Sequence, residues 1–201
     1  DKDVKRGMLA IQPLGKGQFQ LDVVSLFPSD TWDNGKSVFR ADIMQNLKEY
    51  APDFIRFPGG CIVHGVNEAT MYHWKKTIGP IENRPGQWSK WAPYYRTDGI
   101  GYHEFYELCE YLGADAMYVI PTGMICTGWV KQSSPWNFIQ PDVDLDAYIQ
   151  DALDAIEYAI GPETSKWGAL RVKNGHPTPF PLKYIEIGNE DFGPVYWERY
   201  E

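Results

Sequence analysis

The chain has 201 residues, of which 43% are hydrophobic and 23% are charged, as expected for a globular domain with a sizeable core. Its 19 basic and 27 acidic side chains give a formal net charge of −8. No basic cluster gathers on any stretch, which argues against nucleic acid or an anionic membrane surface as a partner. No apolar run reaches the roughly 18 residues that a membrane span needs.

The aromatic content is high, at 15%, with eight tryptophans and thirteen tyrosines. Aromatic rings fill protein cores, but they also line sites that bind sugars or nucleic acid bases. Because the chain is acidic, carbohydrate is the ligand class that we favour.

The first predicted elements alternate between strand and helix. Residues 20–27 form an apolar, β-branched run closed by Pro28, which predicts a strand. Residues 38–50 predict a helix, and residues 53–57 predict a short strand that ends at "PGG". The apolar face expected for this helix consists of Phe39, Ile43, Leu47 and Tyr50.

The alternation continues after a long loop that is rich in aromatic residues and proline. Asp98 is a plausible cap for a helix that Gly113 ends. A buried strand is predicted at 116–120, a helix with six inward positions at 144–160, a last strand at 184–187, and the start of a further helix after it. The inward positions are Leu145, Tyr148, Ile149, Ala152, Ile156 and Ala159.

Strands separated by helices pair in parallel, with the helices outside the sheet. This leaves an open doubly wound sheet or a (β/α)8 barrel. No glycine-rich phosphate fingerprint follows a strand, whereas "PGGC", "PTGM" and "GNED" each follow one directly. Barrel enzymes build their sites from the loops at these strand ends. We therefore predict a partial (β/α)8 TIM barrel, roughly its first half, made of parallel strands with outer helices.

The stretch "GNED" presents Asn189 and Glu190 at a strand end. A carboxyl group between apolar walls has a raised pKa and can donate a proton near neutral pH, while an amide can hold a sugar hydroxyl. The pair suits protonation of a glycosidic oxygen, although a solvated loop end is the alternative. We interpret Asp191 as structural or solvated, and we expect Arg56, a charge inside an apolar strand, to have partners.

The three cysteines Cys61, Cys109 and Cys126 form no dense framework and leave the compartment open. Cys109 falls in a helical pattern and is expected to be a buried apolar residue. Cys61 and His64 have a metal-like spacing, but no second close pair of ligands accompanies them. No metal site is predicted, and His64 is interpreted as a hydrogen-bonding residue of the loop or of the rim of a site.

Four ordered motifs, "FIRFPGGC", "HWKKTIGPIENRPG", "DGIGYHEFYELCEYLGA" and "LKYIEIGNED", resemble glycoside hydrolase family 51, the α-L-arabinofuranosidases. The resemblance runs from "VVSLFP" almost to Glu201. It is strongest to the subgroup that has Cys after PGG, where many bacterial members carry Asn.

The resemblance implies a retaining mechanism without metal or cofactor. Glu190 matches the acid/base, Asn189 matches the amide that contacts the sugar 2-hydroxyl, Cys61 matches a position near the sugar, and Trp91 falls where an aromatic wall is expected. The residues themselves suggest two further contacts, with Gly60 allowing close backbone approach and the loop aromatic Trp74 offering a ring.

A retaining glycosidase needs a second carboxylate about 5–5.5 Å from the first. In this family it comes from a late strand, beyond residue 201, and the family's first strand also has no match here. Glu82, Glu104 and Glu107 do not directly follow a strand, which argues against them as nucleophile. The chain begins at Asp1 without a visible signal peptide and is expected to be an excised or processed piece. Residues 1–201 are thus expected to form an incomplete catalytic barrel segment that is inactive alone. We expect it to be stable only against the remainder of the barrel, supplied by another chain or by missing residues.

The function expected from this resemblance is release of α-L-arabinofuranosyl residues from arabinan or arabinoxylan-type glycans. Two alternatives stay open: a non-catalytic carbohydrate-binding fragment, and a related barrel glycosidase that acts on xylan or glucan. The substrate class suggests an extracellular or periplasmic location.

Overall fold

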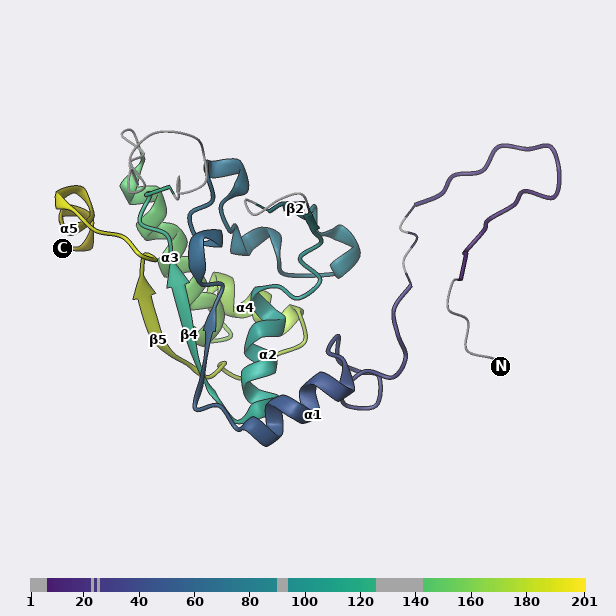
Figure 1. Cartoon of the computed structure of the whole chain (residues 1–201), viewed down its shortest axis with the longest axis horizontal. Coiled ribbons are helices and arrows are strands. Elements are labelled where there is room, and N and C mark those ends of the chain that lie inside the picture. Colours follow the sequence, from purple (N-terminus) through teal and green to yellow (C-terminus); the bar gives the residue numbers. More distant parts are fainter. Residues whose placement is uncertain (1–6, 23, 25, 90–93, 126–142) are drawn as a thin grey trace.

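The computed structural model describes residues 7–22, 24, 26–89, 94–125 and 143–201. At the centre of these residues lies a three-stranded parallel sheet, in the order β1 (Phe54–Phe57), β4 (Asp115–Ile120), β5 (Leu182–Ile187) (Figure 1). The strands predicted at 53–57, 116–120 and 184–187 are confirmed, as is their parallel pairing.

The register aligns the carboxyl ends of the three strands at one edge of the sheet. Phe57 pairs with Tyr118, Tyr118 pairs with Ile185, and Ile120 pairs with Ile187. The segments after the strands therefore start beside one another, as the barrel interpretation requires.

One face of the sheet carries the helices. The core joins side chains of β1 and β4 to α2 (Tyr102–Leu112) and α3 (Leu145–Ile160), while α4 (Lys166–Lys173) packs against α3. The chain also forms α1 (Ala41–Tyr50) before β1 and α5 (Pro194–Tyr200) after β5. No helix in the described ranges is long and apolar enough to span a membrane.

The described residues of the long loop between β1 and α2 form several 3₁₀ turns and a small β-ribbon. The loop includes a two-stranded antiparallel ribbon, formed by β2 (Gln87–Trp88) and β3 (Tyr95–Arg96). Its 3₁₀ turns are Gly60–Ile62, Glu68–Thr70, Trp74–Lys76 and Ile81–Asn83.

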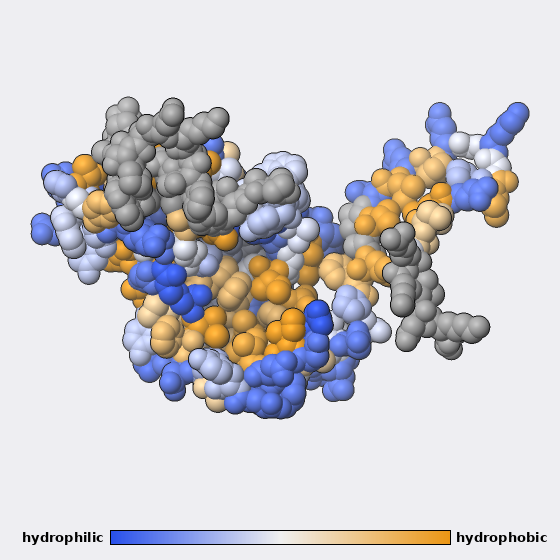
Figure 2. Space-filling view, viewed as in Figure 1, coloured by the Kyte–Doolittle hydropathy of each residue, from blue (hydrophilic) through white to orange (hydrophobic). Residues whose placement is uncertain are grey.

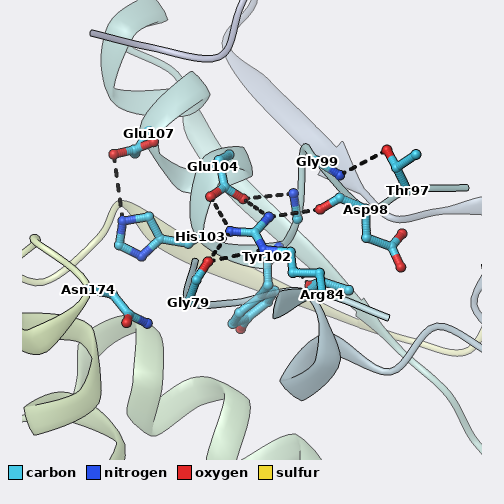
Figure 3. A network of polar contacts seen from close by, with 12 residues as sticks. Gly79, Arg84, Thr97, Asp98, Gly99, Tyr102, His103, Glu104, Glu107 and Asn174 are labelled. Carbon is cyan, nitrogen blue, oxygen red and sulfur yellow. Dashed lines mark hydrogen bonds and ion pairs between the residues drawn. The ribbon is translucent and has the colours of Figure 1, made fainter. Parts of the chain in front are cut away.

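A buried ion pair ties this loop to the start of α2 (Figure 3). The Arg84 guanidinium donates to both carboxylate oxygens of Glu104, at 2.6 and 2.8 Å, and their side chains are 2% and 9% exposed. Arg84 also donates to the carbonyls of Gly79 and Asp98, and Glu104 accepts the backbone N–H of Gly101. Since these partners satisfy the buried charges, Glu104 serves as an anchor of the loop.

The core is built largely from aromatic rings. Trp74, Tyr102 and Tyr158 have no exposed surface, and their ring centroids lie 5.0–5.9 Å apart. Their polar atoms have partners: Tyr106 Oη donates to Tyr102 Oη at 2.7 Å, and Tyr102 Oη donates to Ala155 O at 3.0 Å. Burial raises the pKa of Tyr102 well above its ordinary value, so the hydroxyl stays neutral. Much of the aromatic content therefore serves packing.

Several predicted boundaries and faces were wrong in detail. Helix α2 begins at Tyr102, and its cap is Gly101 rather than Asp98. Gly101 packs closely on the Thr77 carbonyl, where a Cβ would clash. Asp98 instead pairs with Arg96. In α1 it is Met44 that is buried, while Ile43 and Tyr50 are exposed. In α3 the buried set is Asp154, Ala155, Tyr158 and Ala159, and Ile149 is exposed.

The strand predicted at residues 20–27 is not formed at the described positions 20–22, 24, 26 and 27. This segment runs away from the body (Figure 1), and Leu21, Val24 and Leu26 are more than half exposed. A β-branched run needs a neighbouring strand for its backbone hydrogen bonds, and the described residues offer it none.

Apolar surface is also exposed on the body. Figure 2 shows apolar side chains gathered over β1 and α2, above the charged side chains of α1. Phe54 of β1 and Tyr184 of β5, which alternate with the core-facing positions of their strands, are 49% and 42% exposed. In the described part of the chain, no layer covers this face of the sheet, which is opposite to the face that carries the helices.

Candidate active site at the strand ends

Arg56 joins the two outer strands of the sheet across the middle one. Its Nε and Nη2 atoms each donate to the Glu186 carboxylate of β5 at 2.5 Å, and Nη2 also donates to Asn189 Oδ1 at 2.8 Å. The expectation that Arg56 would have partners is confirmed. Gly59 makes room for this arrangement, because a Cβ at that position would strike the guanidinium.

Two carboxylates, those of Glu186 and Glu190, stabilise the positive charge of Arg56. The hydrogen bond with Glu186 raises the pKa of Arg56 above its ordinary value, and the Glu190 carboxylate acts in the same direction. Arg56 thus stays positively charged and provides a fixed electrostatic partner at the mouth of the sheet.

The side chain of Asn189 is oriented by this bridge. Asn189 is 5% exposed, and because Arg56 can only donate, its Oδ1 faces Arg56. The Nδ2 donor is then left buried without a hydrogen-bond partner among the described residues. A buried donor without an acceptor is costly.

Glu190 follows in an unusual backbone conformation. Its φ is +56°, in the left-handed region, and Gly188 two positions earlier has a φ of +80°. The residue is exposed at the strand end, so the described residues do not form the apolar walls that the sequence analysis considered for it. Together these angles form a sharp turn that buries Asn189 and leaves the next carboxylate outside.

Asp191 turns back into the protein. Its side chain is 1% exposed, and Oδ2 accepts a hydrogen bond from Thr122 Oγ1 at 2.8 Å. Of the two alternatives expected for Asp191, structural or solvated, the structure supports the structural one. The turn of residues 188–191, which follows β5, is therefore attached to the segment that follows β4.

The sequence profile of the Alpha-L-arabinofuranosidase 1 domain matches residues 46–201. The chain belongs to the α-L-arabinofuranosidases of glycoside hydrolase family 51.

Relatives in this family are similar over most of this chain. Alpha-L-arabinofuranosidase 1 of Arabidopsis thaliana is 41% identical over 90% of the chain, and an extracellular exo-alpha-L-arabinofuranosidase of Streptomyces chartreusis is 36% identical over 98%. These matches span 25% and 24% of the relatives' lengths. The chain therefore corresponds to about a quarter of each relative.

Solved structures of α-L-arabinofuranosidases agree with this assignment. An arabinose-bound family 51 enzyme, MgGH51, superposes with a TM-score of 0.69 at 36% identity, covering 84% of this chain and 26% of that one. The Thermotoga maritima enzyme in an arabinose complex gives a TM-score of 0.58 at 29% identity, covering 79% of this chain and 27% of that one. The structural relatives have TIM-barrel catalytic domains, and this chain is a fragment of such a domain.

Among the site residues predicted from the sequence, the structure brings Asn189 and Glu190 together with the loop that follows β1. Gly60, with a φ of +61°, begins the 3₁₀ turn that contains Cys61. Cys61 is buried beside Met124 and is disulfide-bonded. It has no free thiol to offer, and the contacts of Gly60 and Cys61 with a sugar stay predictions.

The two predicted aromatic contacts have different outcomes. Trp74 lies in the core, where its Nε1 donates to Asp151 O at 3.2 Å and its ring has no exposed surface. It is enclosed because the loop folds it between α2 and α3, so it presents nothing to a sugar in this family 51 chain. Trp91 lies outside the described residues.

Two residues of the site have contacts that the sequence analysis did not predict. Glu186 lies inside the last strand, where its alternation with Ile185 and Ile187 could have indicated a face opposite to the core. His64 was interpreted as a hydrogen-bonding residue of the loop or of the rim of a site, and its ring contacts the backbone of Asn189, a partner that the sequence did not indicate. Neither contact has a signal in the local sequence, because the partners lie more than a hundred positions away.

Proposed function

We propose that this chain carries the acid/base side of a retaining glycosidase site that releases α-L-arabinofuranosyl residues from arabinan or arabinoxylan-type glycans. The observation that supports this most is the pairing at the end of β5: a buried Asn189 with an unused N–H donor next to an exposed Glu190. The amide would hold a sugar hydroxyl oxygen while the adjacent carboxyl group faces the glycosidic oxygen.

In the first step of this mechanism, a second carboxylate attacks the anomeric carbon and the bond from that carbon to the leaving oxygen breaks. The Glu190 proton passes to the leaving oxygen. In the second step, Glu190, now a carboxylate, takes a proton from water as the water oxygen attacks the anomeric carbon. Arabinose leaves, the second carboxylate is released, and Glu190 is protonated again.

The second carboxylate would lie about 5–5.5 Å from Glu190. Glu104 is held by Arg84 and Glu186 is held by Arg56, so neither is free to attack a sugar. We propose that the nucleophile and the strands that complete the barrel come from another chain or from residues beyond these 201. The uncovered face with Phe54 and Tyr184 supports this proposal, because a barrel interior would enclose it.

The substrate would be met outside the cytoplasm, in the extracellular or periplasmic space. Arabinan and arabinoxylan are polymers too large to enter a cell intact. The extracellular relative from Streptomyces chartreusis supports the same location.

The test is hydrolysis of 4-nitrophenyl α-L-arabinofuranoside by the complete protein, meaning this chain together with the residues that complete its barrel. Glu190→Ala should lower turnover by at least about a hundredfold, as expected for loss of a general acid/base. Added azide should restore turnover of this activated substrate, since the small anion replaces the water that Glu190 activates. The matched control is Glu198→Gln, which alters an exposed carboxylate in α5.

Three results would contradict the proposal. Full activity of Glu190→Ala would exclude Glu190 as acid/base. Binding of arabino-oligosaccharide without any turnover by the complete protein would favour a carbohydrate-binding fragment. Turnover of xylo- or gluco-configured substrates in preference to the arabinofuranoside would favour a related glycosidase.

A further inference from the structure

His64 is a buried polar residue that no step of the proposed mechanism uses. It lies just after the 3₁₀ turn at the end of β1 and is 1% exposed. The described residues contain no cluster of three His, Cys, Asp or Glu side chains that could hold a metal ion with it. Its placement therefore calls for another explanation.

The His64 ring packs against the turn that carries Glu190. Its Nε2 lies 3.1 Å from Asn189 N, 3.3 Å from Asn189 O and 3.1 Å from Asp191 Oδ1. An unprotonated Nε2 accepts the Asn189 N–H, whereas a protonated one faces the Asn189 carbonyl and the Asp191 carboxylate. In both forms the ring contacts the peptide that leads directly into Glu190.

The same turn is held from its other sides. Asp191 accepts from Thr122 at 2.8 Å, and the Gly188 N–H donates to Ile120 O at 2.9 Å. The side chain of Asn189 is held by Arg56. Among the described residues, His64 thus provides the contact with the backbone of the turn on the β1 side.

This support matters because Glu190 has a φ of +56°, which residues other than glycine rarely adopt. Such a conformation persists only where the surroundings determine it. If the His64 contact were lost, the turn could relax and Glu190 would leave its position.

We propose that His64 is a positioning residue, which fixes the Glu190 carboxyl group through the backbone of Asn189. This inference rests on the proposed function of Glu190. Its consequence is specific: loss of His64 should misplace the acid without removing the carboxyl group or the contacts that bind the sugar.

The experiment compares two arabinofuranosides in the complete protein, one with 4-nitrophenol and one with methanol as the leaving group. The first leaving group needs little protonation and the second depends on it. His64→Ala should lower kcat for the methyl glycoside by about 10- to 100-fold, the cost typical of a misplacement near 1 Å. The 4-nitrophenyl substrate should lose much less in kcat/KM, which reports the glycosylation step, and KM for the methyl glycoside should change little. His64→Gln, which can still accept the Asn189 N–H, should restore most of the loss.

His73→Ala is the matched control. His73 belongs to the same loop, but its Nε2 contacts the Glu68 carbonyl. It should leave the ratio of the two activities unchanged. If His64→Ala does not fold, His64→Gln and His64→Asn carry the comparison, since only Gln reaches as far as the imidazole Nε2.

The outcomes separate this inference from the proposed function. If Glu190→Ala is inactive but His64→Ala has wild-type kcat on the methyl glycoside, His64 has no positioning role. An equal loss of kcat/KM on both substrates, accompanied by a lower melting temperature, would mean that His64 only stabilises the fold. Activity that survives Glu190→Ala would overturn the proposed function itself.

Discussion

The Lys75 ammonium donates to Asp154 Oδ2 at 2.5 Å and lies 4.9 Å from the centre of the Trp167 ring. This contact joins the long loop after β1 to α3 and covers the edge of the aromatic core. Burial alone would raise the pKa of Asp154, but hydrogen bonds from Lys75 and Gln150 outweigh it, and the pKa is lowered from its ordinary value.

A carboxyl group with a lowered pKa in the folded state stabilises the fold above its unfolded pKa, and this contribution is lost as the pH falls through the folded value. We expect Asp154→Asn to lower the free energy of unfolding near neutral pH by up to about 1 kcal/mol, since Lys75 is partly exposed. The difference between variant and wild type should shrink below about pH 4. Urea unfolding at several pH values measures it, with the exposed Glu163→Gln as control; a difference that does not depend on pH would contradict this account.

Asn189→Asp should abolish most activity while preserving the fold. The new carboxylate is isosteric and can accept from Arg56, so the thermal midpoint should move little. The Nδ2 donor is lost, and removal of one preorganised donor costs about 10²–10³ in kcat. Steady-state kinetics on an arabinofuranoside would show this; a variant with unchanged kcat/KM would exclude Nδ2 from substrate contact.

Gly188→Ala should destabilise the protein by about 1–3 kcal/mol, the range for a strained left-handed position. A Cβ there would meet the Asp191 carboxylate and the Thr122 methyl group. Gly113→Ala is the control, because its φ of +71° is similar but no atom lies within 4 Å of the added Cβ. Chemical unfolding should show the larger loss at Gly188; equal losses would mean that the contacts with Asp191 and Thr122 tolerate the methyl group.

Cys109 should resist alkylation in the folded protein. Burial raises the pKa of its thiol to about 12, and the residue is 1% exposed. Since only the thiolate reacts, modification by iodoacetamide at pH 8 should be slow until denaturant is added. Peptide mapping by mass spectrometry follows the site directly. Rapid labelling under native conditions would show that α2 opens readily.

The sequence allowed most of the fold to be predicted. The strands at β1, β4 and β5 are short apolar runs ended by glycine or proline, and such signals are local. Helix α4 was missed because Arg171 faces inward, where it donates to the carbonyls of Tyr158 and Ala159, so the segment lacks an apolar stripe. His103, at the start of α2, is also buried, and no local pattern indicates its partner, Tyr158 Oη, which lies 2.7 Å from its Nδ1.

The site could be predicted only in part. Glu190 and Asn189 stand at a strand end and belong to a motif, which made them visible in the sequence. The contacts that orient them come from Arg56 and His64, each more than 120 positions away. Such pairings depend on how strands are ordered in the sheet, and no local pattern records that order.

The bridge from Arg56 to Glu186 joins residues 130 positions apart and passes over a strand that belongs to neither. Closing a contact between residues so far apart in the sequence costs chain entropy. Such contacts therefore typically form late in folding. Asn189 can be oriented only after β1, β4 and β5 have assembled. Partly folded chains should therefore have helices and aromatic clusters before they have any capacity to hold a sugar, so that sugar binding can serve as a probe of the last folding step.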